Sequence, residues 1–128
     1  MTENRTIMIA DDDEHVRKLF VSYFNTVLPE INIIQAKNGK EAADKLEEIS
    51  QICPPDAILT DFNMPVMNGL ELLKFIRNHS DPRIKNLRVV MLTGEVTEKL
   101  QEYTNALNCQ LFEKPARLAK ISSALLEK

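Results

Sequence analysis

The 128-residue sequence has few of the features that mark specialised classes of protein. Its only two cysteines, Cys53 and Cys109, lack the spacing of a metal or redox pair, so we expect reduced thiols and no disulfide framework. No basic run occurs and the formal net charge is −3, which argues against nucleic-acid binding. No apolar run approaches the length of a membrane span, and the polar N-terminus is unlike a signal peptide. These features predict a cytoplasmic location.

The remaining composition is that of an ordinary globular protein, with 44% hydrophobic and 27% charged residues. The sequence has no internal repeat, low-complexity tract or linker, so residues 1–128 are expected to form a single domain. Short apolar runs alternate with segments of helical periodicity. We expect strands at 6–10, 31–36, 57–60, 87–92 and 109–113, and helices at 14–28, 40–52, 70–76, 97–107 and 116–127. This alternation predicts an α/β fold: a doubly wound five-stranded parallel sheet with helices on both faces.

Four of these strands end in polar residues that can carry chemistry. Asp11 and Asp12 follow the first strand, Asp61 follows the third, Thr93 the fourth, and Lys114 the fifth. Ligands of open parallel sheets bind beyond the carboxyl ends of the strands, so these side chains are expected to share one pocket. Three carboxylates that close would raise one another's pKa unless a cation joined them, and Mg²⁺ suits carboxylate and phosphate oxygens. The pattern predicts a magnesium site in which Asp61 attacks phosphorus, while Lys114 and Thr93 bind the phosphoryl group.

Each of these residues alone has a simpler structural interpretation. An aspartate at a strand end is often a helix N-cap, which is the role expected of Asp13, and Thr97 is expected to cap the helix that follows it. His15 and His79 are expected on exposed helix positions and are given no role. Only the set of strand-end residues favours a functional site.

In this order, the strand-end residues and their neighbours resemble the CheY-like receiver domain of two-component response regulators. The resemblance runs from Ile7 to Leu126 and rests on Asp11-Asp12, Asp61 to Gly69, Thr93 to Glu95, and Lys114-Pro115. It implies the flavodoxin-like strand order 2-1-3-4-5. It also implies that Pro65 and Gly69 shape the loop after Asp61 through the backbone.

The resemblance assigns roles to the pocket residues. Asp61 would be the phosphoacceptor and would take a phosphoryl group from a phosphohistidine on a sensor histidine kinase or a histidine phosphotransfer protein. Mg²⁺ would be held by Asp12, Asp61 and the backbone carbonyl of Asn63, with Asp11 reaching it through water. The phosphoryl oxygens would be bound by Lys114 and Thr93. The domain would catalyse its own phosphorylation and dephosphorylation without being a dedicated enzyme.

The resemblance also implies a signalling output. Phosphorylation would change the conformation of the surface formed by 97–107, 109–113 and 116–127, which would act on a downstream protein or an attached output domain. The domain would be a monomer or a phosphorylation-dependent dimer, without membrane or nucleic-acid contacts of its own.

Three positions depart from the family pattern. Leu111 stands where an aromatic residue usually reports phosphorylation, and Phe112 and Tyr103 are the candidates to replace it. Asn108 stands in the turn before the last strand, where it can adopt the left-handed conformation that glycine normally supplies. Ala116 replaces an aromatic residue that is common after Lys114-Pro115.

Two other functions share part of this pattern. A haloacid-dehalogenase-type phosphatase also uses a strand-end aspartate with Mg²⁺, but it needs a second aspartate where this chain has Asn63. An interaction module that kept the fold without phosphorylation would not need the complete residue set.

Overall fold

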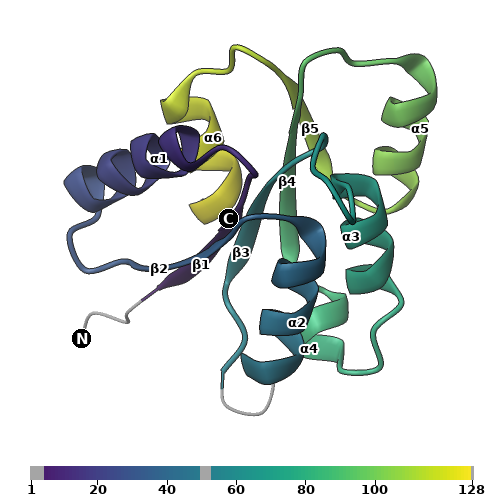
Figure 1. Cartoon of the computed structure of the whole chain (residues 1–128), viewed down its shortest axis with the longest axis horizontal. Coiled ribbons are helices and arrows are strands. Elements are labelled where there is room, and N and C mark those ends of the chain that lie inside the picture. The colour runs from purple at the N-terminus through teal and green to yellow at the C-terminus, as the bar shows by residue number, and fades with distance from the viewer. Residues whose placement is uncertain (1–4, 50–52, 128) are drawn as a thin grey trace.

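The computed structural model describes residues 5–49 and 53–127, in which strands and helices alternate along the chain except where α4 directly follows α3 (Figure 1). The strands are β1 (Thr6–Ala10), β2 (Asn32–Ala36), β3 (Ala57–Asp61), β4 (Arg88–Thr93) and β5 (Gln110–Glu113). The helices are α1 (Glu14–Val27), α2 (Gly39–Ile49), α3 (Gly69–Arg77), α4 (Pro82–Lys85), α5 (Glu98–Ala106) and α6 (Leu118–Leu126). Within these ranges no helix has the length and apolar character needed to cross a lipid bilayer.

The five strands form one parallel sheet in the order β2-β1-β3-β4-β5, as predicted. From β1 the chain first adds β2 on one side and then β3, β4 and β5 on the other, so the direction of winding reverses between the adjacent strands β1 and β3. Ligand sites of such sheets lie beyond the carboxyl ends of the strands at this reversal.

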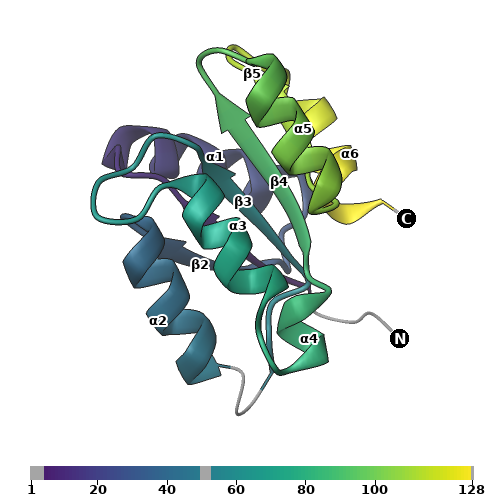
Figure 2. The ribbon, with the colours of Figure 1, turned by 90° about the vertical axis from the view of Figure 1, so that its right-hand side faces the viewer.

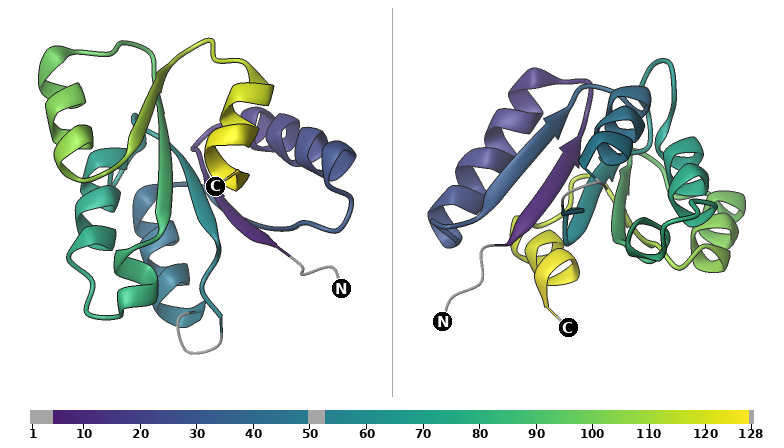
Figure 3. Two further views of the ribbon diagram at one scale, coloured as in Figure 1. Left: turned by 180° about the vertical axis from the view of Figure 1, so that it is seen from behind. Right: turned by 90° about the horizontal axis from the view of Figure 1, so that it is seen from below.

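Helices cover both faces of the sheet (Figures 2 and 3). Alternate strand residues point to opposite faces and divide the core in two. Ile7, Ile9 and Leu59 pack with α1 and α6, whereas Met8, Ile58 and Met91 pack on the side that carries α2, α3, α4 and α5. The central strands are buried on both sides, which explains why their sequences are apolar without alternation.

The predicted caps are present. Asp13 accepts hydrogen bonds from the backbone N–H groups of His15 and Val16, and Thr97 accepts one from Leu100. Asn108 has a φ of 54°, which confirms the left-handed turn expected before β5.

The sequence prediction missed α4, because four residues are too few to show helical periodicity. Its local signal is Asp81 followed by Pro82, an N-cap followed by a proline in the first turn. The predicted end of the second helix at residues 50–52 lies outside the described residues, and the other bounds differ by at most two residues.

Candidate functional site

Three carboxylates meet at the carboxyl end of the two central strands. Asp61 is the last residue of β3, and Asp11 and Asp12 directly follow β1. Ala10 pairs with Thr60, so the next residue on each strand brings Asp11 level with Asp61. One carboxylate oxygen from each of the three residues lies within 4.8 Å of the others.

Thr93 is the last residue of β4, which pairs with β3, and Lys114 directly follows β5, which pairs with β4. The Nζ atom of Lys114 lies 2.7 Å from Oδ1 of Asp61, and the backbone N–H of Lys114 donates to the carbonyl of Thr93. The Thr93 hydroxyl donates to the carbonyl of Glu95 at 3.1 Å and accepts from its N–H at 3.3 Å. The threonine hydroxyl is therefore held within its own turn. Asn63 is exposed in the loop after β3.

Burial and charge act together on the ionisable groups of the pocket. Asp11 and Asp61 are buried, while Asp12 is exposed. Burial, followed by the charges of Asp61 and Asp12, raises the pKa of Asp11 despite a hydrogen bond from the Asp13 N–H and the charge of Lys114. Burial alone would lower the pKa of Lys114, but its hydrogen bond to Asp61 and the nearby carboxylates raise it. Lys114 is thus a cation at neutral pH.

The donor set of the pocket suits a hard divalent cation. Three carboxylates and one ammonium leave two uncompensated negative charges, and all the acidic ligand atoms are oxygens. Mg²⁺ binds through one or two carboxylates and keeps several waters. The exposed Asp12 leaves a side open from which water can enter.

Gly69 packs directly against the backbone of Asp61. A Cβ atom at Gly69 would lie 2.5 Å from the backbone oxygen of Asp61, so only glycine allows α3 to begin this close to β3. The N–H of Gly69 donates to the carbonyl of Phe62 at 2.8 Å. By contrast, a Cβ atom at Gly94 would meet open space, which leaves room next to Thr93.

The model of the response regulator receiver domain family matches residues 7–126. The chain belongs to this family. Chemotaxis protein CheY1 of Helicobacter pylori is 33% identical over 89 residues, which cover 70% of this chain and 67% of CheY1. A protein-glutamate methylesterase/protein-glutamine glutaminase of Bacillus subtilis is 38% identical over 104 residues, 80% of this chain, but the matched region spans only 26% of that protein.

The fold of this receiver domain also agrees with solved structures. The crystal structure of a CheX-CheY-BeF3-Mg complex from Borrelia burgdorferi aligns with a TM-score of 0.80 and 26% identity. The alignment covers 95% of this chain and 87% of the Borrelia chain. Receiver domains act in two-component signalling, and the acidic pocket described above fits that function.

Sequence reasoning missed two side chains that contact this pocket's backbone. The guanidinium of Arg17 donates to the carbonyl of Asp11 at 2.7 Å, and the carboxylate of Glu113 accepts from the N–H of Val96 at 3.0 Å. Both side chains bind backbone groups, which every residue carries, so no motif marks them. The weak signal for Arg17 was its position in the second turn of a helix that begins at the acidic cluster.

The aromatic candidates for the Leu111 position lie elsewhere. Leu111 packs on the side of the sheet that carries α5, whereas Phe112 packs on the opposite side and lines a groove with α6. Phe112 therefore does not share the position of Leu111, because adjacent strand residues point to opposite faces, and its part in reporting phosphorylation stays a prediction. The ring of Tyr103 lies 5.1 Å from Nζ of Lys74 on α3.

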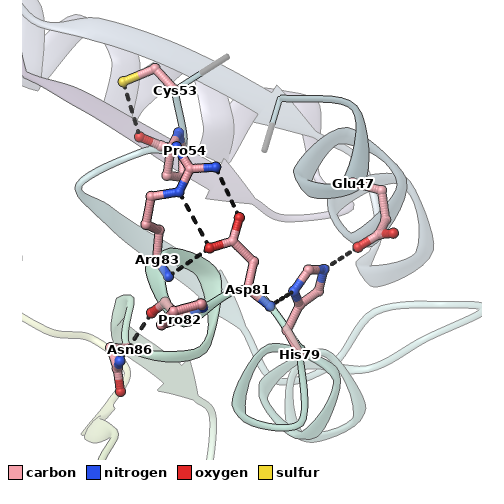
Figure 4. Close-up of polar contacts among 8 residues, drawn as sticks. All are labelled: Glu47, Cys53, Pro54, His79, Asp81, Pro82, Arg83 and Asn86. Carbon is pink, nitrogen blue, oxygen red and sulfur yellow. Dashed lines mark hydrogen bonds and ion pairs between the residues drawn. The ribbon is translucent and has the colours of Figure 1, made fainter. Parts of the chain in front are cut away.

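A second polar cluster lies near the amino ends of the strands, between the ends of α2 and α3 and the start of β4, and Figure 4 shows its contacts. His79 follows α3, and its side chain is only 12% exposed, so the expectation of an exposed helix position is wrong. Its Nε2 contacts Glu47, and its Nδ1 accepts the N–H of Asp81 at 2.9 Å. Asp81 in turn pairs with Arg83. These contacts tie α2, α3 and α4 together.

Proposed function

We propose that this receiver domain accepts a phosphoryl group on Asp61 from the phosphohistidine of a partner kinase or phosphotransfer protein. A carboxylate oxygen of Asp61 attacks phosphorus in line as the P–N bond of the donor breaks and imidazole leaves. The observation that carries this proposal is that one carboxylate oxygen from each of Asp11, Asp12 and Asp61 lies within 4.8 Å of the others, with Lys114 in contact with Asp61. The three carboxylates and the ammonium of Lys114 together carry a charge of −2, which a divalent cation neutralises before transfer. The phosphoryl group then adds negative charge that nothing in this set compensates.

The pocket residues take distinct parts in this transfer. Asp12, Asp61 and the backbone carbonyl of Asn63 would hold Mg²⁺, and Asp11 would reach it through water. When bound, Mg²⁺ neutralises the charge of the phosphoryl oxygens. Lys114, which already contacts Asp61, would pair with one of those oxygens, and Thr93 would donate its hydroxyl to another. Because positioning and neutralisation dominate phosphoryl transfer, no separate general base is required.

The signal would begin with the Thr93 hydroxyl. To reach the phosphoryl group, this hydroxyl must leave the carbonyl of Glu95, which frees the turn that leads to α5. The Val96 N–H, bonded to Glu113 on β5, is the next contact along this loop. We infer that breaking the first contact shifts the second and thus alters the surface formed by α5, β5 and α6. A downstream protein or an output domain would read this surface.

The test is covalent modification measured by intact mass. The protein is incubated with Mg²⁺ and acetyl phosphate, and the wild type is expected to gain one phosphoryl group, whereas Asp61→Asn gains none. Asp13→Asn is the matched control, since it removes one nearby carboxylate while asparagine keeps the helix cap. A wild type that never gains mass, or an Asp61→Asn variant that does, would contradict the proposal.

The same samples discriminate the phosphatase alternative. Asn63 stands where that class needs an aspartate for proton transfer, and the family match is to receiver domains. Sustained release of phosphate from a simple phosphomonoester with Mg²⁺ would favour a hydrolase. We expect no such turnover. Cytoplasmic location, the single-domain extent of residues 1–128 and phosphorylation-dependent dimerisation remain predictions.

A further inference from the structure

Arg17 connects three elements at the edge of the acidic pocket. Its Nη1 donates to the backbone carbonyl of Asp11 at 2.7 Å, and its Nε donates to the side-chain oxygen of Gln35 on β2 at 3.2 Å. The side chain comes from α1 and is half-buried. It therefore joins α1, the turn after β1, and the strand that pairs with β1.

With this contact, every polar group of Asp11 is held. The N–H of Asp11 donates to the carbonyl of Ala36 at 3.0 Å, and its carboxylate accepts the N–H of Asp13 at 2.9 Å. Arg17 holds the third group, the carbonyl. A peptide unit is planar, so the orientation of the Asp11 carbonyl also sets the orientation of the Asp12 N–H and the position of the Asp12 Cα atom, to which the carboxylate side chain is attached.

Asp12 gains most from this constraint. Asp11 and Asp61 are buried and fixed by their surroundings, whereas Asp12 is exposed. Carboxylates within 4.8 Å of one another repel, and the exposed member has the most freedom to turn away. Because Arg17 binds a backbone carbonyl, it holds this turn without occupying a carboxylate oxygen that a cation would need.

We propose that Arg17 is a positioning residue of the cation site, which fixes the Asp11–Asp12 peptide so that the Asp12 carboxylate stays with Asp11 and Asp61. This inference rests on the proposed function only in taking Asp12 as a cation ligand. A purely structural role, in which Arg17 joins α1 to the sheet, would lower stability and leave cation affinity unchanged.

The test is the affinity of the unphosphorylated protein for Mg²⁺, measured by calorimetric titration. Arg17→Met keeps the apolar stem but loses every donor, and we expect roughly tenfold weaker binding, the lower end of effects seen when supporting contacts of metal ligands are lost. Arg17→Lys keeps the charge and one donor, and should bind about two- to fourfold more weakly than wild type. Lys18→Met is the matched control; it makes the same charge change on the next, exposed residue and should stay within twofold.

Phosphorylation kinetics give a second readout. With acetyl phosphate, Arg17→Met should need more Mg²⁺ for half-maximal rate but reach a rate near that of wild type at saturating Mg²⁺. Unchanged Mg²⁺ affinity in Arg17→Met, with only a lower melting temperature, would overturn the assignment. Should that variant not fold, wild-type affinity in Arg17→Lys would overturn it instead.

The two proposals fail in different ways. A wild type that binds Mg²⁺ but takes no phosphoryl group refutes the proposed function, while the affinities of the variants still decide the role of Arg17. A wild type that is phosphorylated, with Arg17→Met equal to it in Mg²⁺ affinity, refutes only the role of Arg17. A wild type that binds no Mg²⁺ refutes that role as well.

Discussion

Charged side chains gather where the strands end, which we call the carboxyl edge of the sheet, and where the strands begin, which we call the amino edge. The two groups differ in what balances their charge. At the carboxyl edge, Asp11, Asp12 and Asp61 face one another with Lys114 as the cation in contact. At the amino edge, the guanidinium of Arg77 donates to four backbone carbonyls, those of Lys85, Leu87, Leu107 and Asn108, at 2.7 to 3.0 Å. The carboxyl edge therefore holds an excess of negative charge, whereas the guanidinium at the amino edge has hydrogen-bond acceptors for its N–H groups.

The two edges also differ in backbone strain. Val66, in the loop after Asp61, has a φ of 70°, and the N–H of Met67 donates to the carbonyl of Pro65, which makes Val66 the centre of a strained γ-turn. Asn108 has a similar φ of 54° at the amino edge, but asparagine tolerates this conformation. Strain and charge repulsion thus coincide beside the candidate site. A site that must change state is expected to store free energy in this way.

Arg77→Ala should give the largest loss of stability. Its side chain joins the end of α3 to the turns before β4 and β5, and hydrogen bonds to charged groups each contribute about 1.5–3 kcal/mol. Because water can reach part of this cluster, we expect a loss of about 3 kcal/mol in the free energy of unfolding, measured by urea denaturation. Arg77→Lys should recover part of it.

The matched control for Arg77 is Arg83→Ala, which removes an exposed arginine that pairs with Asp81 and should change stability far less. Phosphorylation of folded Arg77→Ala should remain, since its contacts lie away from Asp61. If Arg77→Ala were as stable as wild type, the Arg77 hydrogen bonds at the amino edge would not contribute to the stability of the fold.

Asp11→Asn should stabilise the protein, and the gain should depend on pH. The pKa of Asp11 is raised in the folded state, so the folded protein holds this proton at a higher pH than the unfolded chain. Its contribution to stability is therefore most favourable below the unfolded pKa and is lost as pH rises through the folded pKa. In strong acid the free energy of unfolding of the variant should equal that of wild type. At pH 7 it should be higher by on the order of 1 kcal/mol for carboxylates this close.

Thermal unfolding across pH measures this difference, and Mg²⁺ should remove much of it by stabilising wild type more than the variant. A variant less stable than wild type at pH 7 would show that the three carboxylates do not oppose folding.

An exchange of the two left-handed residues tests the difference in strain. Val66 is 78% exposed and contributes little packing, so Val66→Asn should raise the free energy of unfolding by about 1 kcal/mol. Asn108→Val should lower it by about 1–2 kcal/mol, because a β-branched side chain is poorly tolerated at positive φ. Chemical denaturation checks both values. If the two substitutions changed the free energy of unfolding equally and in the same direction, the backbone strain at Val66 and Asn108 would not differ.

Most of the fold, and the grouping of the pocket residues, could be predicted from the sequence because both depend on short patterns that recur along the chain. Apolar runs identified the central strands, and the residues at their ends had to share one edge once the sheet was parallel. The contacts of Arg17 and Arg77 could not be predicted in this way. The partners of Arg77 are carbonyl groups up to 31 residues away, and a carbonyl carries no sequence signature. The strain at Val66 was hidden for the same reason, since valine favours extended backbone and only the fold imposes the turn.

Glu47→Ala should have the smallest effect, although Glu47 contacts His79 at the amino edge. The Glu47 side chain is 58% exposed although His79 is only 12% exposed, and polar pairs with an exposed partner contribute about 0.2–1 kcal/mol. We expect a loss of at most about 0.5 kcal/mol in urea denaturation, and Glu48→Ala, an exposed neighbour on α2, supplies the baseline for helix propensity and charge. A loss comparable to that of Arg77→Ala would mean that the amino edge depends on its exposed pairs. The stability of the protein would then fall with added salt, whereas the partly buried hydrogen bonds from Arg77 to the carbonyls of Leu87 and Leu107 are screened far less.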